Sequence, residues 1–321
     1  MNHSMIRQVL DCACPLALWN VSGATQSGRG LPQSKTLARL GLLLGCCQLL
    51  QGQSNDPNTQ ALAREARPNG GIVFGAKTVG GDWDLFAMRP DGSAPTVLGK
   101  AGEFPWASWS PDGKMIVCLS PKGIDFVDLA SKKAVRHLDR QGFFQQLIWS
   151  PDGQWLSGVA NSFDTGWSVA RMDAASGKVN PVNKVDCCTP DWFSDSRRIV
   201  FSWRPPGQKA NAGYGWTQLW MADGEGKERR LIFAEDGRHV YGGCISPDGK
   251  YVLFTGNKEE DGDAQNGGAP MGLMRLADAP IIRGDQNSLR QQHPNARPGP
   301  VLPLPGGWEP HWTAIDSKPI P

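Results

Sequence analysis

Trp109-Ser110-Pro111-Asp112-Gly113-Lys114 is the stretch that decides the fold, because its central phrase returns along the chain. The other copies are Ser150-Pro151-Asp152-Gly153, the altered Ser194-Asp195-Ser196 and Ser246-Pro247-Asp248-Gly249. Ser, Pro, Asp and Gly suit the four successive positions of a type I turn, in which Pro presets the backbone angle of the second residue. A bulky residue precedes each copy and an apolar run follows it. Each copy therefore predicts a β-hairpin.

The spacing of the copies indicates the architecture. Their aspartates stand at positions 112, 152, 195 and 248, a period of roughly 40 to 50 residues, which is typical of repeat proteins with one supersecondary unit per repeat. Four short strands per unit at this period predict an all-β fold of the β-propeller type. A β-sandwich with coincidental turns is the alternative, but sandwich strands need not repeat one phrase at a fixed offset.

Composition and charge limit the possible functions. The chain has 321 residues, with a formal net charge of +2 and no block of Lys or Arg. This charge pattern gives no electrostatic basis for binding nucleic acid. No apolar run reaches the roughly 20 residues that a membrane-spanning helix requires.

The eight cysteines do not form a recognisable metal site. None has Cys-x-x-Cys spacing with another, and no His stands nearby at finger spacing, so we expect no zinc. Cys118 and Cys244 fall inside predicted strands, where a buried free thiol is the default. The sequence leaves open whether one of the adjacent cysteines Cys187 and Cys188 forms a disulfide with a distant cysteine.

The first 68 residues differ from the rest. We predict a leader over residues 1–50 and a linker over residues 51–68, which is polar and contains two prolines. Within the leader, residues 35–46 have two basic residues, a short apolar run and a small residue before Cys46, a pattern that indicates an export signal. Leu43-Leu44-Gly45-Cys46 resembles the lipobox of bacterial lipoproteins, which implies lipidation of Cys46. A short apolar helix in the leader is the alternative.

Two stretches resemble a known repeat. Residues 84–93, which read Asp-Leu-Phe-Ala-Met-Arg-Pro-Asp-Gly-Ser, are similar to the third-strand signature of TolB-type, WD40-like propeller repeats. Residues 109–114 are similar to the signature that joins the first and second strands of that family. The resemblance covers roughly residues 69–314 and implies the fold, with a propeller domain over 69–316. These repeats occur in proteins with different functions, so it implies much less about activity.

The units predict five four-stranded blades. The unit that begins at Gly70 lacks a first strand, whereas residues 307–314 match the first-strand phrase without a unit of their own. We therefore expect this C-terminal strand to pair into the N-terminal blade, with Trp312 near Val73. Pairing of this kind leaves no open sheet edge between the first and last blades.

A search for catalytic motifs finds none. The sequence has no Gly-x-Ser-x-Gly elbow, no phosphate-binding loop and no His-Glu-x-x-His. The acidic run over residues 259–263 lacks the spacing of a calcium loop, so we interpret it as a solvated loop. His239 and His311 precede predicted first strands. First strands line the central channel of a propeller, so these are the two histidines placed to meet at one mouth of that channel. We expect no cofactor and no metal site.

The sequence predicts a non-catalytic, exported propeller that binds a protein or a cell-envelope component, since loops on a rigid scaffold carry recognition. Resemblance to TolB implies an envelope lipoprotein or a transport system as partner. It implies a periplasmic or envelope-associated location, with contact to the membrane only through a lipid anchor. The predicted binding rim consists of Glu103, Phe104, Trp106, Phe144, Gln145, Asp191, His239, Tyr241, Trp308, Glu309 and His311. The alternative is a propeller lyase or glycoside hydrolase with its site in the central channel.

Overall fold

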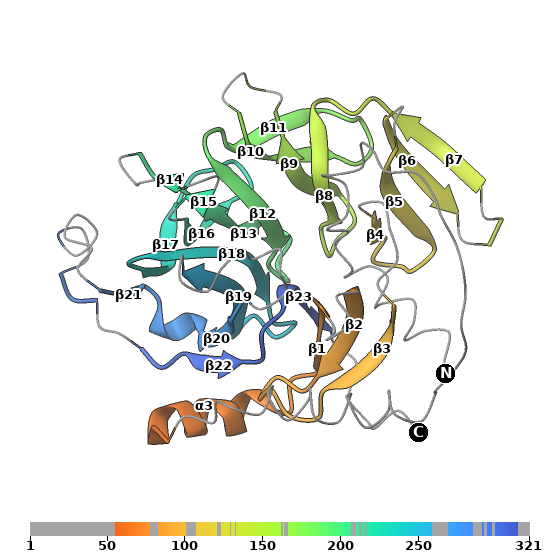
Figure 1. Cartoon of the computed structure of the whole chain (residues 1–321). Coiled ribbons are helices and arrows are strands. Elements are labelled where there is room, and N and C mark those ends of the chain that lie inside the picture. Colours follow the sequence, from red (N-terminus) through yellow and green to blue (C-terminus); the bar gives the residue numbers. More distant parts are fainter. Residues whose placement is uncertain are drawn as a thin grey trace, which may run out of the picture.

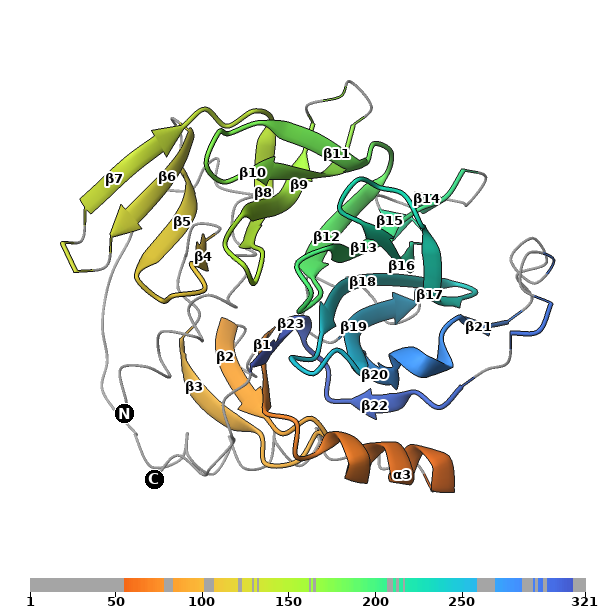
Figure 2. The same ribbon diagram turned by 180° about the vertical axis from the view of Figure 1, so that it is seen from behind.

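The computed structural model describes residues 55–313, except for residues 78–82, 101–106, 121–122, 129, 132, 162, 164–165, 207–209, 212–213, 216, 259–268, 285–290, 292–293 and 297–298. In this part of the chain the strands form five main sheets, arranged as the blades of a ring (Figure 1). The five-bladed β-propeller expected from the repeats is confirmed. Seen from behind, the same ring surrounds a common centre (Figure 2).

The blades are numbered here in chain order, with their strands given from the centre outwards. Blade 1 holds β23 (Trp308–Thr313), β1 (Gly71–Lys77), β2 (Trp83–Met88) and β3 (Thr96–Lys100). Blade 2 holds β4 (Ala107–Trp109), β5 (Met115–Ser120), β6 (Gly123–Asp128) and β7 (Lys133–Leu138). Blade 3 holds β8 (Phe143–Trp149), β9 (Trp155–Ala160), β10 (Ser168–Asp173) and β11 (Val179–Asn183). Blade 4 holds β12 (Cys187–Trp192), β13 (Arg198–Trp203), β16 (Gln218–Asp223), β17 (Arg230–Glu235) and β21 (Ile281–Arg283). Blade 5 holds β18 (Arg238–Ile245), β19 (Tyr251–Lys258), β20 (Met271–Arg275) and β22 (Leu302–Leu304).

Blade 1 combines the two ends of the described chain. β23 pairs antiparallel with β1, so that Trp312 lies opposite Ile72 and His311 lies opposite Val73. The last described strand is therefore the innermost strand of the sheet in which the first strand lies, as the fragment at residues 307–314 predicts.

The Ser-Pro-Asp-Gly turns share one hydrogen-bonding pattern. The Ser110 hydroxyl donates to Asp112 Oδ1 (2.6 Å) and accepts from the Met115 amide (2.9 Å). The Gly113 amide donates to the Ser110 carbonyl (2.8 Å), and Gly113 has φ +67°, a conformation that glycine adopts without steric cost. The same bonds recur in the turns that begin at Ser150 and Ser246. Each of these turns therefore satisfies its own polar groups.

The altered copy keeps the turn with different side chains. Phe193 stands where the other copies have Ser, and its carbonyl accepts from the Ser196 amide (3.0 Å). Ser196 takes the glycine position with φ +56°. The Arg198 guanidinium binds Asp195 (2.6 Å) and lies 4.4 Å from the centre of the Phe193 ring. Asp195 Oδ1 accepts from the Arg198 amide (3.0 Å), the bond that the serine hydroxyl accepts in the other copies. The ion pair and the cation–π contact are additional.

The hydrophobic core lies mainly between neighbouring blades. Phe126 and Trp149 meet edge to face at 5.8 Å between blades 2 and 3. Phe233 and Phe254 stack at 4.6 Å between blades 4 and 5. Aromatic contacts of this kind add to the stabilisation from burial itself.

Blade 4 has two additions that the repeats do not predict. β21 pairs in parallel with β17, placing Ile281 beside Phe233, and makes this a five-stranded sheet. The insert over residues 204–215 contains the short hairpin of β14 (Ala210–Asn211) and β15 (Tyr214–Gly215). A 3-10 turn, η3 (Leu276–Asp278), joins β20 to the segment that leads to β21.

The interpretation of residues 51–68 as a linker is wrong for residues 57–66, which form helix α3 (Pro57–Ala66). Asp56 caps the helix by accepting a hydrogen bond from the Thr59 amide (2.8 Å), and Pro57 occupies the first turn, where its missing N–H costs nothing. Leu62 and Ala66, four residues apart on one face, are fully buried against blades 1 and 5. The helix lies along β22 (Figure 1).

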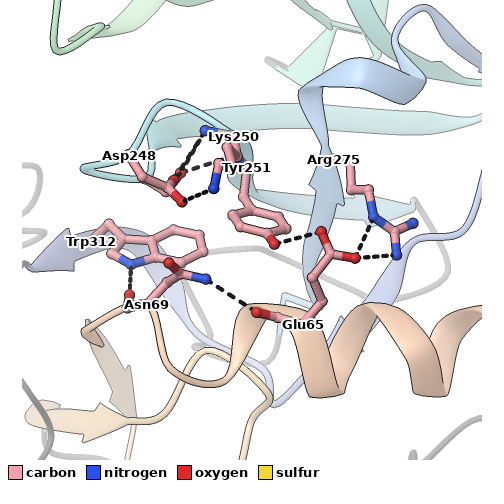
Figure 3. A network of polar contacts seen from close by, with 8 residues as sticks. Glu65, Asn69, Asp248, Lys250, Tyr251, Arg275 and Trp312 are labelled. Atoms are coloured by element: carbon pink, nitrogen blue, oxygen red, sulfur yellow. Dashed lines mark hydrogen bonds and ion pairs between the residues drawn. The ribbon is translucent and has the colours of Figure 1, made fainter.

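A polar network fastens the end of α3 to the ring (Figure 3). Glu65 accepts hydrogen bonds from the Tyr251 hydroxyl (2.7 Å) and from two nitrogens of Arg275 (2.9 and 2.7 Å). The Trp312 indole donates to the carbonyl of Asn69. Hydrogen bonds from Arg275 and Tyr251 hold the pKa of Glu65 below its ordinary value of 4.5.

We expect Ser150→Ala to lower the free energy of unfolding by about 1–2 kcal/mol, because Ser150 is fully buried and the Trp155 amide loses its hydroxyl acceptor. Urea denaturation measures the change. Ser131→Ala, which removes an exposed hydroxyl bonded to Asp128, is the control and should change stability by less than about 0.5 kcal/mol. Equal losses in the two variants would contradict the importance of the buried turn hydroxyl.

The contribution of Glu65 should depend on pH. Its pKa is lower in the folded state than in the unfolded chain, so the stabilisation is complete above pH 4.5 and is lost as the pH falls through the folded pKa. We expect Glu65→Gln to be less stable than wild type by about 0.5–1 kcal/mol at pH 7, and the difference to shrink below pH 4.5 and to vanish once Glu65 is protonated in the folded state. Denaturation at several pH values checks this. Glu228→Gln, at an exposed carboxylate without an ion pair among the described residues, is the control.

Candidate functional site

The predicted rim is only partly described by the structure. Glu103, Phe104, Trp106 and the lipidation candidate Cys46 lie outside the described residues. For Trp308 and Glu309 the structure describes the backbone, which belongs to β23. The side chains that are described are Phe144, Gln145, Asp191, His239, Tyr241 and His311.

Asp191 takes part in a hydrogen bond that repeats between blades. Each inner strand concerned ends in a bulky residue. The side chain of the residue just before it accepts a hydrogen bond from a backbone amide of the next blade. Asp191 Oδ2 accepts from the Ile245 amide (3.2 Å), and Cys244 Sγ accepts from the Trp312 amide (3.1 Å). Ser108 Oγ accepts from the Trp149 amide in the same way (3.2 Å). Asp191 is therefore placed as part of the link between blades 4 and 5.

Blade 3 makes its link differently, because Ile148 stands at this position and has no side-chain acceptor. Gln146, two residues earlier, accepts from the Thr189 amide (2.9 Å). The Thr189 hydroxyl in turn accepts from the Gly242 amide of blade 5 (3.1 Å). The inner strands of blades 3, 4 and 5 are thus connected through side chains as well as through packing.

The two histidines predicted to meet at a channel mouth, His239 and His311, lie within β18 and β23 and have separate partners. His239 Nδ1 lies 2.8 Å from the Thr217 hydroxyl, and its ring lies 4.8 Å from that of Tyr241. His311 Nδ1 lies 4.0 Å from Cys244 Sγ. Within the described part of the chain, no three or more His, Cys, Asp or Glu side chains are grouped so that they could hold a metal ion.

The cysteines described by the structure, Cys118, Cys187, Cys188 and Cys244, are free thiols. Burial is the main cause that raises the pKa of Cys187 far above its ordinary value. Its sulfur donates to the Asn183 carbonyl (3.1 Å) and accepts from the Val169 amide (3.1 Å). Cys187 therefore has a structural role next to the start of β12.

An exposed apolar patch lies where β8, β10 and the segment before β12 begin. Trp167 is 49% exposed and Val185 is 42% exposed. The Phe144 ring meets Trp167 edge to face at 5.4 Å, and the Cys187 amide donates to the Trp167 carbonyl (3.2 Å), which keeps the Val185 segment beside this tryptophan. We call Phe144, Trp167 and Val185 the aromatic patch.

Charged groups border the aromatic patch. The Lys184 ammonium lies 5.7 Å from the centre of the Phe163 ring, and Asp186 forms an ion pair with Arg204 (3.0 Å). An apolar centre with a charged border is the composition typical of a protein interface. Phe144 is among the residues predicted from the sequence, whereas Trp167 and Val185 are not. The signal for Trp167 was its place just before the first residue of β10, at the end of a loop.

Comparisons with known proteins find distant similarity to solved structures. No protein-family model matches the chain, and no match is found among curated proteins. Among solved structures, TolB from Acinetobacter baumannii is 17% identical over 66% of this chain and 51% of its own, with a TM-score of 0.43. A putative TolB from Agrobacterium tumefaciens is 17% identical over 74% of this chain and 83% of its own, with a TM-score of 0.46.

Hydrazine synthase from Kuenenia stuttgartiensis is 18% identical over 73% of this chain and 75% of its own, with a TM-score of 0.44. The chain spans about half the length of the Acinetobacter baumannii TolB (51%). With TM-scores below 0.5, these similarities bear on neither activity nor partner. In the described residues, no helix has the length and apolar character needed to span a bilayer.

Asp191→Ala should lower the free energy of unfolding by about 1–2 kcal/mol, because the Ile245 amide loses its acceptor inside the ring. Chemical denaturation measures this loss. Asp139→Ala, at an exposed aspartate, is the control and should leave stability within about 0.5 kcal/mol. Unchanged stability of Asp191→Ala would show that the link between blades 4 and 5 does not depend on this carboxylate.

Proposed function

We propose that this protein is an exported, non-catalytic β-propeller that binds a protein or another component of the cell envelope. The observation that carries this proposal is the aromatic patch of Phe144, Trp167 and Val185. Contiguous apolar surface with a polar border marks interaction sites on soluble proteins. Tryptophan is among the residues that most often supply the binding energy of an interface.

The scaffold supports this function because it holds the patch rigidly. Side-chain links join the inner strands of blades 3 and 4, and both blades contribute to the patch. A preorganised surface loses little conformational entropy on binding. Of the predicted rim residues, Phe144 belongs to the aromatic patch, whereas Asp191, His239, Tyr241 and His311 lie within the inner strands β12, β18 and β23.

Export is part of the proposal and rests on the sequence of residues 35–46. Two basic residues, an apolar run and Leu43-Leu44-Gly45-Cys46 support export with a lipid anchor on Cys46. Incorporation of radiolabelled fatty acid into the full chain, and its loss in Cys46→Ser, tests the anchor. An unlabelled wild-type chain in a host that processes lipoproteins would remove the anchor from the proposal.

Affinity capture tests the binding surface. The purified chain and a Trp167→Ala, Val185→Ser double variant are each used to capture proteins from a cell-envelope extract of the host organism. We expect wild type to capture a specific partner and the double variant to capture at most about one tenth as much of it. Truncating an interface tryptophan typically costs more than about 1 kcal/mol of binding free energy.

Val135→Ser provides a matched control, since Val135 is 59% exposed but lies on β7, away from the aromatic patch. The control should capture the partner as wild type does. The same yield from the double variant as from wild type would show that the aromatic patch is not the binding surface. Thermal melting of all three proteins checks that they are folded.

A further inference from the structure

A pocket of about 630 Å³ lies at the start of α3, beside blades 4 and 5. The stacked rings of Phe233 and Phe254 form part of its apolar wall, together with Met271 and Val301. Asp56 and Asn58 line it from the helix side. Its volume is within the range of pockets that bind small molecules.

Gly272 leaves the space that the Phe254 ring occupies in the pocket wall. A Cβ on Gly272 would lie 2.8 Å from the Phe254 ring, so a larger residue at this position would displace the aromatic face. A Cβ on Gly256 would likewise lie 2.8 Å from the Arg238 side chain and displace it. This side chain donates to the Gly256 carbonyl (2.8 Å). The shape of the pocket thus depends on these two positions.

Most of the charges in the pocket have partners. Glu235 and Arg238 form an ion pair with an N–O distance of 3.0 Å, and each side chain is only about one-fifth exposed (21% and 18%). Asp56 accepts from the amide and the hydroxyl of Thr59 (2.8 Å each) as the cap of α3. These carboxylates are held by neighbours and still contribute negative potential.

Arg283 differs from the other charged groups in the pocket. Its guanidinium donates to the Gly299 carbonyl (2.8 Å), and it has no ion pair with any described residue. A guanidinium has five N–H donors in a planar fork that fits a carboxylate. The pocket therefore combines an apolar wall with one positive group that has no carboxylate partner within the part of the chain that the structure describes.

We propose that this pocket binds a small monocarboxylate with an apolar body. Its carboxylate pairs with Arg283, and its apolar part lies against Val301 and Pro303, which are apolar lining residues that keep exposed surface. The lining carries two carboxylates, Asp56 and Glu235, and two guanidinium groups, of which Arg238 is paired with Glu235. Arg283 is the one that remains to pair with a ligand, which matches a single negative charge better than a dianion such as a phosphate monoester. This site is independent of the aromatic patch.

Titration of the full chain with three probes tests the proposal: 4-phenylbutyrate, 4-phenylbutan-1-ol and phenyl phosphate. We expect 4-phenylbutyrate to bind at least about tenfold more tightly than the alcohol, since a hydrogen-bonded charge pair is worth that much in a partly enclosed site. Phenyl phosphate should bind more weakly than 4-phenylbutyrate. Isothermal titration calorimetry and ligand-observed NMR measure the affinities.

Arg283→Gln should reduce the affinity for 4-phenylbutyrate to that for the alcohol. Arg230→Gln is the matched control, because Arg230 also donates to one backbone carbonyl (Ala279, 3.0 Å) but does not line the pocket. Asn58→Trp, at an exposed position of the pocket wall, should weaken binding of both probes and serves if Arg283→Gln does not fold. Equal binding of acid and alcohol, tighter binding of phenyl phosphate, or full affinity in Arg283→Gln or Asn58→Trp would each overturn the proposal.

Discussion

The ring depends on hydrogen bonds that cross from one inner strand to the next. Propeller blades share no strand ladder, so neighbouring blades are held mainly by side chains, with single backbone bonds such as the one from the Cys187 amide to the Trp167 carbonyl. Ser108, Asp191 and Cys244 occupy the same place in their repeats and each accept an amide of the following blade. The three differ in chemistry but share the function of acceptor. Hydrophobic packing between blades supplies most of the energy, and these bonds fix the angle and register at which the blades meet.

The same requirement explains which surface is left for binding. The bulky last residues of the inner strands pack inside the ring, and the chain enters these strands at their opposite ends. Trp167 and Val185 lie at those opposite ends, where the chain passes from one element to the next, and they stay exposed. Blade geometry thus separates residues that build the ring from residues that are available to a partner.

Much of the fold was predictable because the turns are encoded locally. In Ser-Pro-Asp-Gly every residue has a role that depends only on its neighbours, so the phrase predicts a hairpin without knowledge of the rest. β21 was not predictable, since its parallel pairing with β17 joins residues about 50 positions apart and has no local signal. Helix α3 was missed despite the cap at Asp56 and the spacing of Leu62 and Ala66, because its polar, short sequence also suits a linker. The aromatic patch was found only at Phe144, since an exposed tryptophan and a buried one look alike in a sequence.

The pairing of β23 with β1 sets an order of events during synthesis. β1 emerges from the ribosome long before residues 308–313 exist, and until then the inner edge of its sheet has no strand to pair with. Blade 4 likewise waits for residues 281–283 before its outer edge is covered. A nascent chain of this protein therefore stays incomplete at both places until residues 281–313 have been synthesised, and this interval is when an unpaired strand edge needs protection from other chains.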